Sequence, residues 1–137
     1  MNTLRYFIGS FVVFLFIFMA EWLFHGMIMN STYIESQHLL RPEAEAVAYF
    51  PSMIAGFLVL SFGFCYIFTK GYEDKGLGEG ARYGFLIGLA FSIPTSLMNF
   101  AVFPIPSNWI ISWCIGEPII MTLAGIIFAS IYRPRKV

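Results

Sequence analysis

Four long apolar runs constrain this chain more than any other feature of its sequence. A helix needs about 20 mainly apolar residues to cross the hydrocarbon core of a bilayer. Runs of that length lie at about 5–29, 47–69, 82–103 and 108–132. Backbone groups in lipid must find their hydrogen-bond partners within their own segment, so we expect every run to form a spanning helix. The sequence therefore predicts an all-α fold in which residues 1–137 form one four-helix transmembrane bundle.

The composition excludes several classes of soluble protein. Charged residues make up 12% of the chain and hydrophobic residues 58%, whereas about a quarter of a typical soluble domain is charged. The net charge is zero, so the chain lacks the basic surface by which proteins bind nucleic acid. The expected partner of the apolar surface of this chain is the lipid bilayer.

The distribution of Lys and Arg predicts the orientation, because short cytoplasmic loops carry an excess of these residues. The connection between the first two runs and that between the last two carry a single Lys or Arg, which is Arg41. The seven other cations share the opposite side: Arg5, Lys70, Lys75, Arg82, Arg133, Arg135 and Lys136. We therefore expect both termini to be cytoplasmic.

Small residues predict where the helices contact each other, because they let two backbones approach closely in lipid. The third run carries such residues at a spacing of four. The predicted packing residues are Gly84, Gly88 and Ser92 in this run, Ser52 and Gly56 in the second, and Gly125 and Ala129 in the fourth. A phenylalanine-rich face of the first run (Phe7, Phe11, Phe14 and Phe18) is a candidate surface for lipid or a partner.

Two acids, a histidine and an asparagine lie inside the runs, where such groups are costly and usually face the interior of a bundle. At a rise of ~1.5 Å per residue, Glu21 lies roughly 24 Å above the cytoplasmic end of its helix and Asn99 roughly 25 Å. Glu117 lies roughly 13 Å below the outer end of its own helix. His25 follows Glu21 by four residues and shares its helical face. All four groups therefore belong to the outer half of the membrane.

This level grouping predicts an outward-facing pocket formed by Glu21, His25, Asn99 and Glu117, with Trp22 and Trp113 as its walls. A carboxylate and an imidazole at this spacing can hold a proton or a metal ion, which makes Glu21 and His25 candidate metal ligands. Two other interpretations remain open. The same side chains can form hydrogen bonds that only fix helix packing, or they can contact another subunit.

No sequence motif indicates catalysis or a particular cofactor. The chain has no phosphate-binding loop, nucleophile elbow, zinc-protease helix or dinucleotide fingerprint. The two cysteines, Cys65 and Cys114, fall in opposite halves of the membrane and have no metal-ligand spacing. An enzyme is accordingly the least supported class of function.

Three short segments resemble a group of small bacterial membrane proteins with four spans and uncharacterised activity. They are Glu21-Trp22-Leu23-Phe24-His25-Gly26, Gly80-Ala81-Arg82-Tyr83-Gly84 and Pro104-Ile105-Pro106. The resemblance implies a location in the bacterial inner membrane. It implies no activity, cofactor or catalytic residue.

Two functions are therefore expected. The small size and the absence of a soluble domain favour an accessory or interaction subunit of a larger membrane complex. The polar pocket favours a small transporter or a metal- or proton-binding protein, which with only four spans would act as a homo-oligomer.

Overall fold

The computed structural model describes residues 1–133, which are helical apart from short connections and contain no strand. The four helices long and apolar enough to cross a membrane are Thr3–Ile28, Glu43–Lys70, Leu77–Val102 and Ser107–Ile131. The first comprises α1 (Thr3–Leu23) and the π-helical turn η1 (Phe24–Ile28); the others are α3, α4 and α5. Two short helices, α2 (Asn30–Glu35) and η2 (Gln37–Leu39), lie between η1 and α3. The predicted all-α class with four long apolar helices is confirmed.

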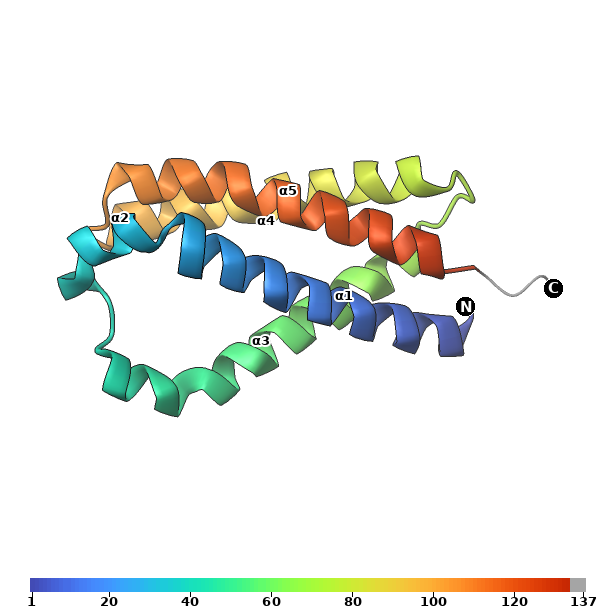
Figure 1. Ribbon diagram of the computed structural model, residues 1–137. Helices are drawn as coiled ribbons and strands as arrows, with labels where there is room; N and C mark the ends of the chain where they lie inside the picture. Colours follow the sequence, from blue (N-terminus) through green and yellow to red (C-terminus); the bar gives the residue numbers. More distant parts are fainter. Residues whose placement is uncertain (134–137) are drawn as a thin grey trace.

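The start of α1 and the end of α5 lie side by side (Figure 1). The Arg5 guanidinium donates to the carbonyl of Ile131 over 3.5 Å. We call this end of the molecule the terminal end, and the opposite end, where α2 lies, the α2 end. Two of the cations used to predict orientation, Arg135 and Lys136, lie outside the described residues.

Helices α4 and α5 pack backbone to backbone through glycines. A Cβ added at Gly84 would collide with the main chain of Met121, and one added at Gly88 would lie 2.7 Å from the Cα of Pro118. Gly80 and Gly125 face each other in the same way, next to Ala129. Four of the predicted packing residues, Gly84, Gly88, Gly125 and Ala129, thus lie in this contact.

Aromatic side chains close the bundle at the terminal end. Phe68 of α3 packs edge-on against Phe128 of α5 with ring centroids 5.4 Å apart. The hydroxyl of Tyr83 on α4 donates to the carbonyl of Phe64 on α3 over 2.6 Å. The hydroxyl of Tyr6 on α1 donates to the carbonyl of Phe62 over 3.1 Å. All four long helices are therefore tied together at this end.

The connection from α3 to α4 is organised by one buried carboxylate. Glu79 accepts the backbone N–H groups of Glu73 (2.6 Å) and Lys75 (2.8 Å). Glu73, whose side chain is exposed, pairs with Lys75 over 2.7 Å and Arg82 over 2.9 Å. These cations hold the pKa of the Glu73 carboxyl below its ordinary value. The connection therefore fixes where α4 starts.

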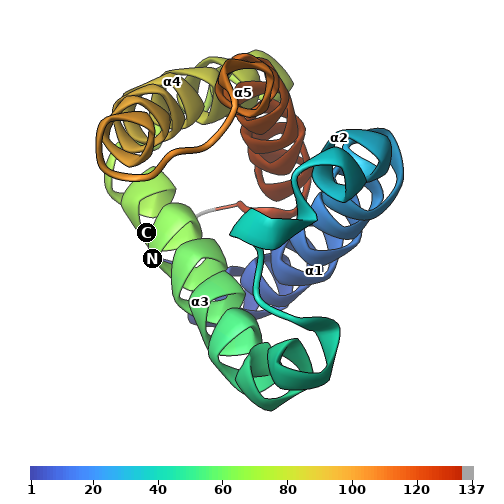
Figure 2. The same ribbon diagram turned by 90° about the vertical axis from the view of Figure 1, so that its left-hand side faces the viewer.

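Helix α3 diverges from α4 and α5 toward the α2 end (Figures 1 and 2). The prediction that Ser52 and Gly56 pack against another helix is corrected here, because both are exposed and a Cβ at Gly56 would meet nothing within 4 Å. Ser92 of α4 is partly buried, and its hydroxyl donates to the Gly88 carbonyl of its own helix over 2.6 Å. The divergence leaves space between α3 and α4.

The phenylalanine-rich face of α1 is divided in two by α3. Phe14 is buried, and Phe18 packs edge-on against Phe57 of α3 at 5.9 Å. Phe7 and Phe11 remain more than half exposed, at 54% and 52%. Only this second part remains available to lipid or a partner.

Candidate functional site

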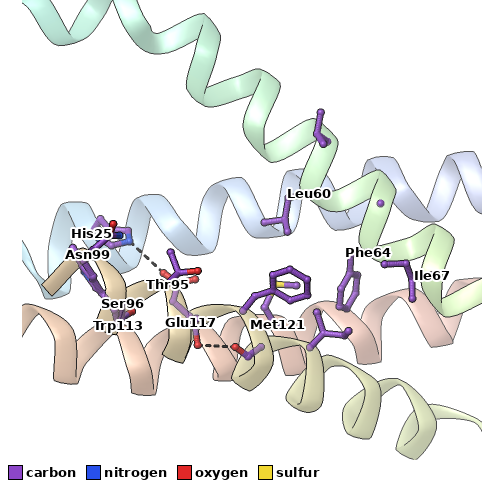
Figure 3. A pocket seen from close by; sticks show the side chains of 16 residues that line it. His25, Leu60, Phe64, Ile67, Thr95, Ser96, Asn99, Trp113, Glu117 and Met121 are labelled. Atoms are coloured by element: carbon purple, nitrogen blue, oxygen red, sulfur yellow. Dashed lines mark hydrogen bonds and ion pairs between the residues drawn. The ribbon is translucent and has the colours of Figure 1, made fainter. Parts of the chain in front are cut away.

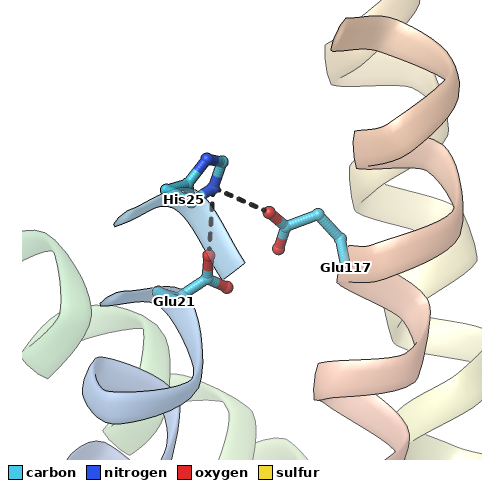
Figure 4. Close-up of side chains that lie close together, drawn as sticks. All are labelled: Glu21, His25 and Glu117. Carbon is cyan, nitrogen blue, oxygen red and sulfur yellow. Dashed lines mark ion pairs between the residues drawn. The ribbon is translucent and has the colours of Figure 1, made fainter. Parts of the chain in front are cut away.

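Three side chains from two helices meet near the α2 end. Nε2 of His25 lies 3.2 Å from Oε2 of Glu21 on the same helix and 3.6 Å from Oε1 of Glu117 on α5 (Figure 4). One donor atom from each of the three residues lies within 4.8 Å of the other two. The structure therefore brings together three of the four polar residues that the sequence grouped by depth. We call Glu21, His25 and Glu117 the triad.

The π-helical turn and a glycine contact bring His25 to Glu117. The N–H of Met29 donates to the carbonyl of Phe24, five residues earlier, over 2.9 Å. Such turns widen a helix locally and are frequent at functional sites. The Phe24 ring lies directly on Gly116, where any Cβ would collide with it. Phe24 packs on Gly116, and the residues that follow these two in the chain, His25 and Glu117, face each other.

Pro118 sets the other side of this arrangement. The proline is buried, and its Cα packs against Gly88 of α4. Successive residues of a helix point about 100° apart, so Glu117 turns away from α4 and toward His25. The close contact between α4 and α5 therefore fixes the carboxylate that meets α1.

Tyr33 of α2 holds the second ring nitrogen of His25. Its hydroxyl lies 2.5 Å from His25 Nδ1 and accepts a hydrogen bond from Trp113 Nε1 over 2.9 Å. The rings of His25 and Tyr33 stack with centroids 5.8 Å apart. Burial raises the pKa of the Tyr33 hydroxyl above its ordinary value, and the hydrogen bond from Trp113 offsets part of this rise. Tyr33 is therefore neutral at physiological pH and can donate or accept a hydrogen bond.

The triad is accessible from one side only. The Glu21 side chain is 9% exposed, whereas those of Glu117 and His25 are 26% and 37% exposed. Glu21 thus forms the floor of the site, and His25 and Glu117 form its open side. This open side of the triad is left uncovered by the described part of the chain.

A groove of about 500 Å³ lies beside the triad, between the diverging α3 and α4 (Figure 3). His25, Glu117, Asn99 and Trp113 line its end nearest α2. Asn99 and Trp113 therefore lie next to the triad, as the sequence predicted.

The prediction for Trp22 is corrected, because this side chain is 58% exposed and lies outside the groove lining. Trp22 immediately follows Glu21, and consecutive residues of a helix point in different directions. The burial of Glu21 against α5 therefore turns Trp22 outward, where its indole suits a lipid interface.

The sequence did not predict three residues of the site, Tyr33, Thr95 and Ser96. Tyr33 lies eight residues beyond His25, and no helical spacing links the two because η1 and a change of direction intervene. Thr95 and Ser96 line the groove together with Asn99. The spacing of these three residues on α4, at positions 95, 96 and 99, was the signal available in the sequence.

The triad combines ligand types that suit borderline divalent metals, namely two carboxylates and one imidazole. Among the described residues, the triad is the group of three His, Cys, Asp or Glu side chains whose ligand atoms lie close enough together to hold a metal ion. In comparisons with known proteins, no family model, curated protein or solved structure matches this chain.

Proposed function

We propose that this chain is a small multi-pass membrane protein that binds a divalent transition-metal ion through Glu21, His25 and Glu117. The observation that carries the proposal is the convergence of three donor atoms within 4.8 Å. They come from two helices that pack together, so the fold itself brings the ligands together. Three protein ligands would leave a fourth position for water or a transported ligand, as in zinc sites that are not purely structural.

The spacing of the donor atoms supports an ion of the Zn²⁺ type. Zinc–nitrogen and zinc–oxygen bonds of about 2.0–2.1 Å in a tetrahedron place two ligands roughly 3.3 Å apart. His25 Nε2 lies 3.2 Å from the Glu21 carboxylate and 3.6 Å from that of Glu117. Rotation of the partly exposed Glu117 side chain suffices to complete the set. Tyr33 would then accept the Nδ1–H of His25, the usual arrangement behind a metal-bound histidine.

The orientation that we propose places the terminal end in the cytoplasm of a bacterium and the triad in the outer half of its inner membrane. Arg5, Lys70, Lys75, Arg82 and Arg133 belong to the terminal end, whereas Arg41 lies in the connection at the α2 end. This asymmetry supports N-in/C-in topology. The open side of the triad would then receive ions from outside the cytoplasm.

The direct test is zinc binding by the purified full-length protein in lipid nanodiscs. We expect one bound Zn²⁺ per chain by elemental analysis, and a titration whose affinity falls as the pH drops, because protons compete for all three ligands. Glu117→Gln preserves side-chain size and should weaken binding at least tenfold. Glu43→Gln, a fully solvated acid at the start of α3, is the matched control and should leave affinity unchanged.

Two outcomes would separate the metal from its rivals. Unchanged zinc affinity in Glu117→Gln would contradict the metal site. Protein that takes up no added Zn²⁺, but whose Glu21 and Glu117 carboxyl signals in infrared spectra change with pH, would instead make the triad a proton site. Retained folding in the variant, checked by circular dichroism, keeps either result interpretable.

A second candidate function is that of an accessory subunit of a larger membrane complex. The specific observation in its favour is the pair of exposed rings on α1, Phe7 and Phe11, which α3 leaves uncovered. Native mass spectrometry from the protein's own membrane tests it. A different protein bound at a fixed ratio supports this function, and a homo-oligomer or bare monomer contradicts it.

A further inference from the structure

The groove between α3 and α4 changes in polarity along its length (Figure 3). Toward the α2 end its walls carry Thr95, Ser96 and Asn99 of α4, next to His25 and Glu117. Toward the terminal end the walls are apolar, with Phe64 and Ile67 of α3 and Ile87 of α4. One continuous space therefore has a polar end and an apolar end.

The size of the groove limits what can occupy it. A spanning helix is ~10–12 Å wide and ~30 Å long, so it fills roughly 2,500 Å³. The groove holds about 500 Å³, which lies within the range of about 300–1,000 Å³ for small-molecule sites. A single hydrocarbon chain or a small molecule fits within this space, whereas a partner helix would lie over it.

The charges around the polar end limit the head group. Among residues 1–133, no Lys or Arg lines the groove, while the carboxylate of Glu117 does. The groove-lining group that can carry positive charge, His25, already faces the carboxylates of Glu21 and Glu117, and the same two carboxylates would balance a divalent ion in the triad. A phosphate or fatty-acid carboxylate would therefore find no surplus positive charge to pair with it, which is costly in a medium of low dielectric constant. Hydroxyl and amide groups of Thr95, Ser96 and Asn99 instead suit an uncharged head that carries hydroxyl groups.

A second cavity lacks this combination of a polar end and an apolar end. It lies between α1 and α5, measures about 460 Å³, and has Ser112 as its one side chain with a hydroxyl, amide or charged group among the described lining residues. It therefore offers a hydrocarbon surface without a polar end.

We infer that the groove between α3 and α4 is a binding site for an uncharged single-chain amphiphile of the monoacylglycerol or long-chain alcohol class. The hydrocarbon tail lies between Phe64, Ile67 and Ile87, and the hydroxylated head lies beside Asn99, Thr95 and Ser96. Entry is sideways from the bilayer, through the gap left by α3. The inference does not depend on a metal ion, because none of these contacts requires one.

A glycine pair on α3 provides a matched test. Added Cβ atoms at Gly63 and Gly56 both meet nothing within 4 Å, and both positions are exposed. Gly63 lines the groove and Gly56 does not. Gly63→Leu therefore fills the groove without displacing a neighbour, whereas Gly56→Leu makes the same substitution two turns earlier on α3, at an exposed position outside the groove lining.

The experiment uses full-length protein in nanodiscs and a monoacylglycerol that carries a photoactivatable diazirine on its acyl chain. We expect labelling to map to residues 59–67 of α3 and 87–91 of α4, and unlabelled monoacylglycerol to compete where the equivalent fatty acid does not. Gly63→Leu should reduce labelling of these segments at least fivefold, and Gly56→Leu should leave it unchanged. Asn99→Leu should remove the preference for monoacylglycerol over an alkane-tailed probe without a head group.

Three results would overturn the inference. One is equal labelling of both glycine variants, since general contact with lipid would explain it. Another is equal competition by the fatty acid, which would contradict the uncharged head. The third is a disulfide-linked dimer formed efficiently by Gly63→Cys, which would place a second copy of the chain over the groove. Metal binding measured on the same samples tests the triad separately.

Discussion

At the scale of single residues, His25 is the residue on which the site depends, because it contacts Glu21, Glu117 and Tyr33. Its Nε2 faces both carboxylates, and its Nδ1 faces the Tyr33 hydroxyl. When Nε2 carries a proton it donates to the acids, and Tyr33 donates to Nδ1. When Nε2 binds a metal, the proton moves to Nδ1 and Tyr33 accepts it. The tyrosine hydroxyl serves both states without a change of geometry.

This double role predicts the effect of Tyr33→Phe. The substitution removes the hydroxyl that orients His25 and leaves the ring that stacks on it. Loss of such an outer partner typically weakens metal affinity by about 10–100-fold. We expect a loss of this size in zinc titrations of the nanodisc-embedded protein, with the stoichiometry unchanged.

Tyr49→Phe is the control for this prediction. Tyr49 is also exposed toward the α2 end, where its ring packs under Arg41 at 3.8 Å, a contact that phenylalanine retains. Zinc affinity should remain at the wild-type value. Equal losses in the two variants would mean that Tyr33 acts on general stability and not through His25.

At the scale of helices, α4 and α5 form the rigid half of the molecule. Their glycines allow the backbones to touch, and this contact holds Pro118 and therefore Glu117 in place. Helix α3, by contrast, meets α4 and α5 near the terminal end and diverges from both of them toward the α2 end (Figure 1). Glu117 therefore lies on a closely packed pair of helices, while α3, one wall of the groove beside it, diverges from that pair.

The prediction for this contact concerns Gly84→Ala. The added methyl group would collide with the Met121 main chain, which cannot move aside as a flexible side chain can. Overpacking of this kind costs about 1–3 kcal/mol. We expect a loss of that size in the free energy of unfolding, measured by circular dichroism during titration with a denaturing detergent.

Gly56→Ala is the matched helical control. Nothing lies within 4 Å of the new methyl group, so steric cost is absent. Alanine favours a helix over glycine by about 0.5–1 kcal/mol, so the variant should be as stable as the wild type or slightly more stable. An equally large loss at both positions would contradict the packing argument for Gly84.

The sequence predicted the helices well because length and hydrophobicity decide them locally. It also predicted the meeting of Glu21, His25 and Glu117, because helical rise fixes depth along each span. The predictions for Ser52, Gly56 and Trp22 were wrong, because the presence of a small residue or an indole does not show which way that side of the helix faces. The tilt of α3 and the π-helical turn depend on contacts between helices that no local pattern contains.

At the scale of the whole molecule, one end is closed by aromatic packing and the other is open around polar groups. The interactions of Phe68, Tyr83 and Tyr132 tie the terminal end together. Toward the α2 end, α3 separates from its neighbours and leaves the groove open beside the triad (Figure 1). In the membrane location that we propose, the open end would face one side of the bilayer, so the orientation of the protein would determine which supply of ions it meets.

The orientation is testable with single cysteines in a Cys65→Ala and Cys114→Ala background. Gln37→Cys lies at the α2 end and Leu77→Cys at the terminal end; both positions are exposed, and neither change alters a Lys or Arg. We expect a membrane-impermeant maleimide to label Gln37→Cys in intact cells and Leu77→Cys only after permeabilisation. This follows because cations near the ends of spans hold their loops on the cytoplasmic side. The reverse pattern would turn the triad toward the cytoplasm and make intracellular metal its supply, whereas labelling of both sites in intact cells would contradict a fixed orientation.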